Sequence, residues 1–203
     1  MPSLIKENTL ARCCKCKDKE QKSEEKEKKV TKKSKSTKEP QLQYRDSVKE
    51  SDIEAVREII KSSNFFNQEE IDMAVELVQD RVEKGEKSTY QFLFVEQDNK
   101  TVAYSCYGRI AGTYASYDLY WMGVENQLRG KGIGTEMLKR TEEAIKNAGG
   151  YKIYIETASQ EKYAPTRHFY LASNYILEGC LKDFYGPSDD KHIYTKIVGK
   201  IKK

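Results

Sequence analysis

The residues best suited to chemistry lie in one glycine-rich stretch, Gln127-Leu-Arg-Gly-Lys-Gly-Ile-Gly134. It follows a hydrophobic segment that ends at Val124 and precedes an amphipathic segment that begins near Ile133. Glycines allow a backbone to approach an anion closely, and the free N–H groups and the dipole at a helix start attract negative charge. Arg129 and Lys131 add formal positive charge. The stretch therefore predicts a loop that binds phosphate.

Spacing excludes two common kinds of phosphate loop. A Walker A loop requires a glycine at the position of Glu125, and a serine or threonine where Gly132 follows Lys131. The dinucleotide fingerprint Gly-x-Gly-x-x-Gly meets Thr135 or Met137 where its third glycine belongs. The loop therefore belongs neither to a P-loop nucleotide hydrolase nor to a Rossmann-type dinucleotide site.

The pattern that remains is Arg-x-x-Gly-x-Gly, formed by Arg129, Gly132 and Gly134. The alternative is a solvated turn in which Arg129 and Lys131 face water. We disfavour that alternative because several glycines weaken a helix start unless a ligand compensates for them.

The elements that must position this loop follow from hydrophobic periodicity. We expect strands at residues 42–48, 91–96, 101–107, 117–124, 151–157, 175–181 and 192–198, and helices that start at residues 51, 67, 133 and 165. Ser51 with Glu54, and Asn67 with Glu70, have the spacing of a helix start, and Gly85 is expected to end the second helix. The order β-α-α-β-β-β-α-β-α-β-β predicts an α/β domain with a mixed sheet of about seven strands and helices on both faces.

With loop and elements combined, the chain resembles the GNAT superfamily of acetyl-CoA-dependent N-acetyltransferases. The pyrophosphate loop of that family has the form Gln/Arg-x-x-Gly-x-Gly/Ala after a strand that ends in valine, as Val124 does here. The segment from Pro165 to Tyr175 is similar to the family's Phe/Leu-Tyr-x-x-x-Gly-Phe segment. The resemblance covers about residues 42–200 and implies the GNAT fold, with a mostly antiparallel mixed sheet and acetyl-CoA as cosubstrate.

The resemblance also implies roles for individual residues. The pantetheine arm of the cofactor would pair with backbone groups of Met122, Gly123 and Val124, and an N–H near Val124 would polarise the thioester if the fourth and fifth strands splay apart. Tyr170 occupies the place of the tyrosine that protonates the departing thiolate. The pyrophosphate would bind the N–H groups of Arg129, Gly130, Lys131, Gly132, Ile133, Gly134 and Thr135.

Direct acetyl transfer to an amine also needs a proton acceptor. Glu156, at the C-terminal end of its strand, is the first candidate, and Asp118 or Tyr120 is the second. Glu156 could equally be a surface carboxylate in an ion pair, since water can relay the proton. The alternative for Tyr170 is a core aromatic, and Arg167 would contact the cofactor 3′-phosphate or an acidic surface group.

The acceptor amine is not identified by the sequence. The aromatic residues Tyr104, Tyr107, Tyr114, Tyr117 and Tyr120, together with Phe65 and Phe66, predict an aromatic-lined acceptor cleft. A small amine, an amino acid and a protein terminus all remain open as acceptors. A non-catalytic acyl-CoA sensor is the alternative function.

Composition divides the chain into two parts. Residues 1–40 hold 13 Lys/Arg and 7 Asp/Glu, whereas residues 41–203 hold 23 and 25, so the formal charges are +6 and −2. All 21 aromatic residues lie beyond residue 40. We therefore expect a disordered leader at 1–40, able to contact nucleic acid or an anionic membrane weakly, and a catalytic domain at 41–203 whose slight acidity favours a cationic acceptor. The expected protein is cytoplasmic, and a homodimer is a further expectation.

The cysteines and histidines predict no metal centre in the domain. His168 and His192 lack paired ligand spacing, and we expect Cys106 and Cys180 to be buried, reduced thiols in strands. The expected leader contains three further cysteines, Cys13, Cys14 and Cys16. Their thiols could ligate a metal, carry lipid or form an unstructured reduced cluster.

Overall fold

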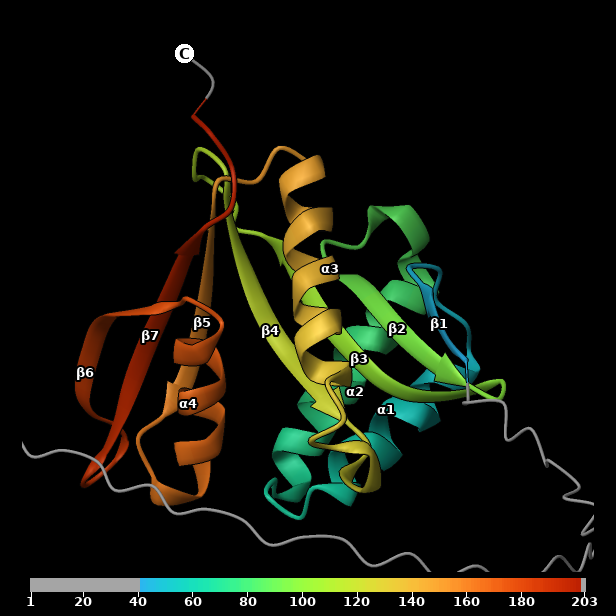
Figure 1. Cartoon of the computed structure of the whole chain (residues 1–203), viewed down its shortest axis with the longest axis horizontal. Coiled ribbons are helices and arrows are strands. Elements are labelled where there is room, and N and C mark those ends of the chain that lie inside the picture. The colour runs from blue at the N-terminus through green and yellow to red at the C-terminus, as the bar shows by residue number, and fades with distance from the viewer. Residues whose placement is uncertain (1–40, 202–203) are drawn as a thin grey trace, which may run out of the picture. The chain divides into compact units, whose positions relative to one another are not determined.

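The computed structural model describes residues 41–201, so the expectations for residues 1–40, including Cys13, Cys14 and Cys16, lie outside the described residues. The described part forms one seven-stranded sheet in the order β1-β2-β3-β4-β5-β7-β6, with helices on both faces (Figure 1). The strands are β1 (Leu42–Arg45), β2 (Gln91–Gln97), β3 (Lys100–Arg109), β4 (Ser116–Val124), β5 (Lys152–Ala158), β6 (Ile176–Gly186) and β7 (Asp189–Ile197). The helices are α1 (Ser51–Ser62), α2 (Gln68–Lys84), α3 (Ile133–Asn147) and α4 (Ala164–Ala172).

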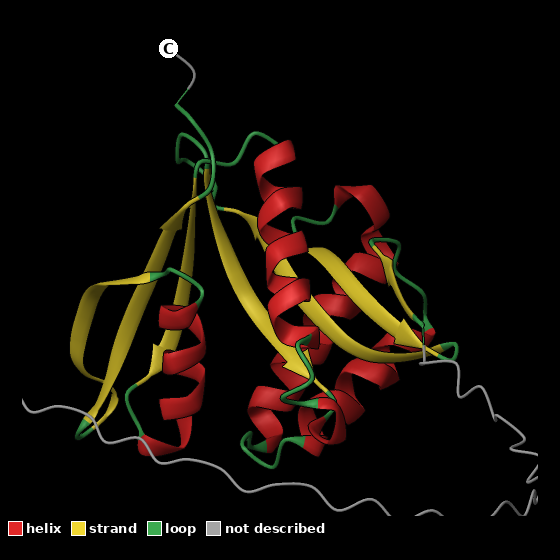
Figure 2. Ribbon diagram, viewed as in Figure 1, coloured by secondary structure: helices red, strands yellow, loops and turns green. Residues whose placement is uncertain are grey.

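The order of these elements confirms the expected α/β fold (Figure 2). All neighbouring strands in the described sheet are antiparallel except β4 and β5, which are parallel. Each helix starts within one residue of its expected position. The first strand ends at Arg45, earlier than the expected residue 48.

The first two helices begin in different ways. Helix α2 has the expected capping box, because the Asn67 side chain accepts from the Glu70 N–H at 2.9 Å and the Glu70 carboxylate accepts from the Asn67 N–H at 2.8 Å. For α1 the expected cap at Ser51 is wrong, since Glu50 is the N-cap residue and makes no capping hydrogen bond with its side chain.

A buried carboxylate secures the start of α1 instead. Asp52 is fully buried, accepts from the Lys49 N–H at 2.8 Å and forms a two-pronged ion pair with Arg45 of β1. Arg45 also donates to Glu96 of β2 at 2.7 Å, and Thr101 of β3 bonds to Asp52 at 3.1 Å. This network links the first helix to three strands. Every buried charge in it has a partner, as buried charges require.

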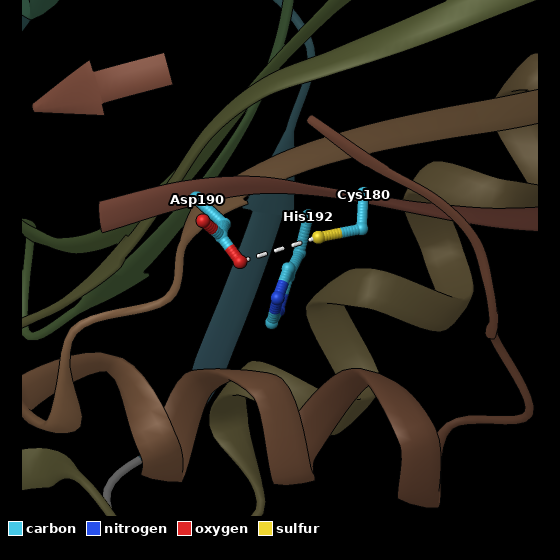
Figure 3. Close-up of side chains that lie close together, drawn as sticks. All are labelled: Cys180, Asp190 and His192. Carbon is cyan, nitrogen blue, oxygen red and sulfur yellow. Dashed lines mark hydrogen bonds between the residues drawn. The ribbon is translucent and has the colours of Figure 1, made fainter. Parts of the chain in front are cut away.

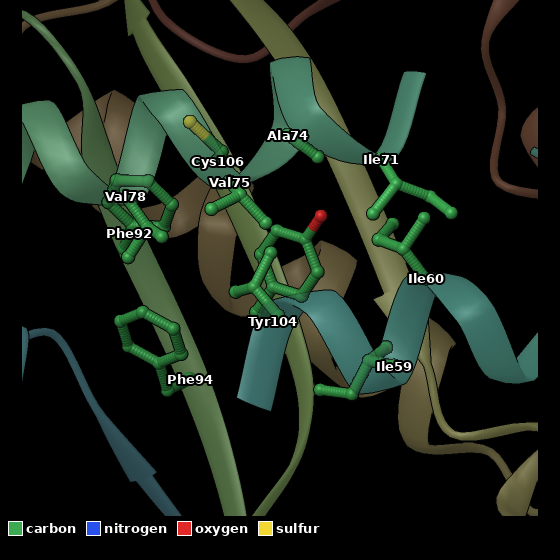
Figure 4. Close-up of a cluster of buried hydrophobic side chains, with 11 residues drawn as sticks. Ile59, Ile60, Ile71, Ala74, Val75, Val78, Phe92, Phe94, Tyr104 and Cys106 are labelled. Carbon is green, nitrogen blue, oxygen red and sulfur yellow. The ribbon is translucent and has the colours of Figure 1, made fainter. Parts of the chain in front are cut away.

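Hydrophobic layers form on opposite faces of the sheet. Helices α1 and α2 pack on one face of β2 and β3, around side chains such as Phe92 and Tyr104 (Figure 4). Helix α3 packs on the other face, where Met137 is fully buried. Helix α4 contributes Tyr170 to an aromatic cluster with Tyr194 of β7, on the same side as α3. The glycine-rich loop therefore starts a helix that is anchored along its length.

The parallel pair β4 and β5 separates soon after it begins. Their pairing runs only from Ser116 with Lys152 to Asp118 with Tyr154, and the two strands then diverge (Figure 1). Strand β4 also contains a bulge, because Cys106 of β3 pairs with Trp121 while the next residue pairs with Leu119, which leaves Tyr120 as the extra residue. A bulge bends and twists a strand, so it helps to turn β4 away from β5.

The sheet order explains the burial of the two cysteines of the domain. Cys106 is buried in β3 as expected, whereas the expectation for Cys180 is wrong, since this residue is exposed. The reason is its position on β6, the edge strand, most of whose residues are exposed. None of the described helices is long and apolar enough to cross a membrane.

Candidate active site

The glycine-rich loop leaves an open concavity of backbone at the start of α3. Gly130 and Gly132 have φ angles of +74° and +82°, and a Cβ added at either would meet no atom within 4 Å. Gly132 is the N-cap residue of α3 and offers no side chain to the first helical N–H groups. These donors therefore remain available to an anion from outside the chain.

Two cations flank this helix start. Within residues 41–201 neither Arg129 nor Lys131 forms an ion pair with a carboxylate. The Arg129 guanidinium lies 5.5 Å from the ring centre of Phe65, and its Nε donates to the Val124 carbonyl at 3.4 Å. Burial lowers the pKa of Arg129 from its usual value, yet an arginine stays charged at neutral pH. The loop thus carries uncompensated positive charge.

The end of β4 forms one wall of the split between β4 and β5. Beyond Asp118 the described part of the sheet gives β4 no strand partner on the β5 side. Val124 and Met122 lie 3.7 and 3.8 Å from the position of a Cβ added at Gly134, so these side chains pack beneath the loop. A Cβ added at Gly123 would come within 2.9 Å of Ile59, which leaves no room for a side chain there. The backbone of residues 122–124 is therefore held against α1 and beside α3.

Tyr170 lies in the aromatic cluster beside this split. It is 7 % exposed, and its ring centre lies 5.4 Å from Phe169, 5.8 Å from Tyr175 and 6.3 Å from Tyr194. Leu119 of β4 belongs to the same cluster. Burial raises the pKa of Tyr170 to about 12, so its hydroxyl keeps its proton at neutral pH.

The candidate bases lie near the place where β4 and β5 begin to separate. The Glu156 side chain is half-exposed and its carboxylate pairs with the Lys191 ammonium at 2.6 Å. Burial, and then the negative charge of Glu156, raise the pKa of Asp118, which Lys191 lowers in part. Burial also raises the pKa of Tyr120 to about 12, and its ring packs edge-on against Tyr90 at 5.4 Å. Its surroundings thus make the Asp118 carboxylate a stronger base than an ordinary aspartate.

The remaining candidates occupy different places from those expected. Arg167 donates to the carbonyls of Ala158 and Gln160 at 3.0 and 2.8 Å, so it ties α4 to the end of β5. Tyr104, Tyr107 and Tyr117 are buried in the core and line no cleft. Tyr120 is 39 % exposed and Tyr114 is 62 % exposed.

Several residues, most of which the sequence analysis did not single out, join the two sides of the split. Phe66, between α1 and α2, packs against Trp121 at 5.2 Å and lies 6.4 Å from Tyr163, which follows β5. Lys162 donates to the Phe65 carbonyl at 3.1 Å. Only the pair Phe65 and Phe66 gave a signal, since exposed phenylalanines in a short connection are unusual. The bulge at Tyr120 and the Lys191 partner of Glu156 had none.

This arrangement defines a class of protein. An α/β fold whose one parallel strand pair splits beside a glycine-rich helix start is that of an acyltransferase. The model of the acetyltransferase (GNAT) family matches residues 53–174, and the chain belongs to that family. No curated protein sequence matches the chain.

Solved structures agree with this assignment. A protein from Desulfovibrio desulfuricans, described as an acetyltransferase of the GNAT family, is 36 % identical with a TM-score of 0.76, over 78 % of this chain and 99 % of that chain. The PaiA N-acetyltransferase of Thermoplasma acidophilum in complex with coenzyme A is 20 % identical, with a TM-score of 0.59 over 77 % and 99 %. An aminoglycoside 6′-N-acetyltransferase, also with coenzyme A, is 14 % identical, with a TM-score of 0.63 over 80 % and 99 %. The last two share the fold.

Proposed function

We propose that this protein transfers the acetyl group of acetyl-CoA directly to a primary amine. The observation that carries the proposal is the split between β4 and β5, which begins after Asp118 and opens beside the glycine loop. Acetyl-CoA is an extended thioester that needs backbone partners along its arm and an anion site at its pyrophosphate. The unpaired end of β4 offers the backbone partners, and the glycine loop that follows it offers the anion site. The coenzyme A bound to two relatives of the same fold supports this choice of cosubstrate.

In this proposal each part of the cofactor has its own binding element. The N–H groups of residues 129–135 and the charges of Arg129 and Lys131 bind the pyrophosphate. The pantetheine arm pairs with the backbone of Met122, Gly123 and Val124. The structure gives Arg167 another use at the end of β5, so we assign the 3′-phosphate to no residue.

The reaction has a balanced set of proton transfers. The amine nitrogen attacks the thioester carbon, the C–N bond forms, and a backbone N–H near Val124 stabilises the oxyanion. The C–S bond then breaks and the thiolate takes the Tyr170 proton. The amine proton passes to a carboxylate, and water then carries that proton from the carboxylate to the Tyr170 phenolate, which restores both groups. We prefer Asp118 to Glu156 as the acceptor, because burial raises the pKa of Asp118, whereas the Glu156 carboxylate is occupied by its ion pair with Lys191.

The acceptor would approach from the side of the sheet opposite α3 and α4. Strand alternation turns Glu156 to the face opposite Ile155, which packs toward α4. Burial, and then the negative charges of Glu156, Asp189 and Glu70, raise the pKa of Tyr185, and burial and then Glu70 raise the pKa of Tyr163. Acidic and aromatic groups thus gather there, and they suit a cationic amine.

The decisive measurement is coenzyme A binding by two matched glycine variants. Gly132→Val places a side chain at a positive φ and in the open space of the loop, whereas Gly112→Val does the same at φ +76° in the β3–β4 connection. We expect the first variant to lose at least about 100-fold in acetyl-CoA affinity and the second to keep it, with both folded by circular dichroism. Equal affinity in both variants would overturn the loop assignment.

Turnover separates an enzyme from an acyl-CoA sensor. Thiol release from acetyl-CoA should appear with part of a panel of diamines, amino acids and peptides with free amino termini. Binding of acetyl-CoA with no release on any amine would instead support the sensor. Deletion of residues 1–40 tests the leader, since we expect any nucleic acid or anionic vesicle binding to disappear and the turnover to stay.

A further inference from the structure

A second group of chemically active side chains lies outside the proposed active site, on the β6–β7 hairpin. Cys180 of β6 pairs in register with His192 of β7, so the two side chains point to the same face of the sheet. Asp190 lies two residues before His192 on the same strand and shares that face. Figure 3 shows these three side chains, with Asp190 and Cys180 joined by a hydrogen bond.

The distances between the ligand atoms approach those of a metal site. One ligand atom from each of the three residues lies within 4.8 Å of the other two. The Cys180 Sγ and the Asp190 Oδ2 are 3.4 Å apart. Tetrahedral zinc with bonds of about 2.3 Å to sulfur and about 2.0 Å to oxygen would separate the same atoms by roughly 3.5 Å. The Cys180 sulfur and the Asp190 oxygen are therefore already at about the separation that a tetrahedral zinc ion requires.

The Asp190 carboxylate is oriented as a metal ligand would be. Its Oδ1 accepts from the Asp183 backbone N–H at 3.0 Å, which turns Oδ2 toward Cys180. Hydrogen bonds of this kind from outside the ligand set fix carboxylates in metal sites. The Lys182 ammonium lies 2.5 Å from the same Oδ2 and supplies positive charge at that atom.

His192 provides an independent sign that a partner is needed. Its Nδ1 is buried and has no hydrogen-bond partner in the described part of the chain. A buried polar atom without a partner is rare in folded proteins and calls for a missing water or ion. Cys180, in contrast, is exposed, so the cluster is open to solvent on one side.

We propose that Cys180, Asp190 and His192 form a binding site for one Zn²⁺ ion, with water as the fourth ligand. Sulfur, carboxylate oxygen and imidazole nitrogen are the donors that zinc prefers, and three protein ligands with an open fourth position are a common set. On binding, the Cys180 thiol releases its proton to water and the Lys182 ammonium leaves Oδ2. One divalent ion thus replaces two single positive charges, and the site keeps its net charge. The ion links the edge strand β6 to β7.

The test uses Co²⁺ as a spectroscopic probe on the full-length chain. Cys13, Cys14 and Cys16 are replaced by serine in every sample, so that leader thiols add no signal. We expect one Co²⁺ per chain, tetrahedral absorption, a sulfur-to-cobalt charge-transfer band, and displacement of the ion by Zn²⁺. Cys180→Ser should remove the charge-transfer band, and His192→Gln should weaken Zn²⁺ binding at least about 100-fold.

Two further variants separate ligation from a general effect on folding. His168→Gln changes an exposed histidine of α4 outside the cluster and should leave Zn²⁺ affinity unchanged. Lys182→Ala removes the competing ammonium and should tighten Zn²⁺ binding several-fold, which no loss of structure would do. A charge-transfer band that persists in Cys180→Ser, or equal Zn²⁺ affinity in His192→Gln and His168→Gln, would overturn the proposal.

Discussion

The two halves of the sheet are built differently. Helices α1 and α2 cover one face of the first half and α3 the other, whereas β5, β7 and β6 are covered on one face, by α4 and the edge of α3 (Figure 1). Most of the large exposed apolar side chains of the second half lie on β6 and β7, namely Ile176, Leu177, Leu181, Phe184, Tyr185 and Ile197. Strand pairing between the two halves of the described sheet is limited to three residue pairs of β4 and β5.

This difference separates two tasks. The first half holds the glycine loop against α1 and α3, so its backbone can present N–H groups at fixed positions. The second half supplies Tyr170, Glu156 and the Cys180 cluster from strands and a helix with less cover.

The largest effect on stability is expected in the first half. Asp52→Ala removes a fully buried carboxylate and leaves Arg45 with Glu96 as its one remaining carboxylate partner in the network, so it should lower the free energy of unfolding by about 3–5 kcal/mol. Asp72→Ala breaks the exposed pair with Arg57 and should cost at most about 1 kcal/mol. Urea unfolding measures both. Similar losses in the two variants would mean that the first half does not depend on its buried network.

The next effect concerns turnover and lies in the second half. Tyr170→Phe removes the proposed proton donor and should lower the turnover number at least about 100-fold at unchanged acetyl-CoA affinity. Tyr194→Phe is the matched control, because its ring lies in the same buried cluster and it has no assigned role. Thiol release at saturating acetyl-CoA is the measurement. Equal turnover in both variants would remove Tyr170 as the acid.

Local signals explain why the first half was the more predictable from sequence. The capping box of Asn67 and Glu70, the stop at Gly85 and the glycine loop each depend on residues close in the chain. Asp52 was missed because its partner Arg45 comes from another element, across a tertiary contact. Periodicity gave all strands and helices in order, since each buries an apolar stripe.

Register explains what the sequence could not predict in the second half. Cys180 and His192 are brought together by β6–β7 pairing, and Glu156 meets Lys191 through the pairing of β5 with β7. The bulge at Tyr120 adds one residue to β4 and shifts every side chain after it. Neither the register of two strands nor the position of a bulge can be predicted from residue types alone. The sequence therefore pointed to the glycine loop and, through the family resemblance, to Tyr170 as a candidate acid. It did not predict the surroundings of the candidate bases Asp118 and Glu156.

A smaller effect tests how the halves meet at the candidate base. Glu156→Gln removes a negative charge that raises the pKa of Asp118, so that pKa should fall. If Asp118 is the base, the acidic limb of the pH profile of kcat/KM should move to lower pH, with less than about a 10-fold loss at the optimum. Asp118→Asn should lower the rate about 10-fold or more at every pH. A rate abolished by Glu156→Gln and spared by Asp118→Asn would assign the base to Glu156.

The smallest effect is expected on the exposed strand β6. Leu177 is 48 % exposed, so Leu177→Lys in dilute protein should change the free energy of unfolding by no more than about 0.5 kcal/mol. Lysine on an edge strand also opposes pairing with a second chain. Sedimentation velocity over a range of concentrations therefore tests the expected homodimer at the same time. A large loss of stability, or a wild-type dimer that Leu177→Lys dissociates, would show that β6 is covered in solution and that the two halves are equally enclosed.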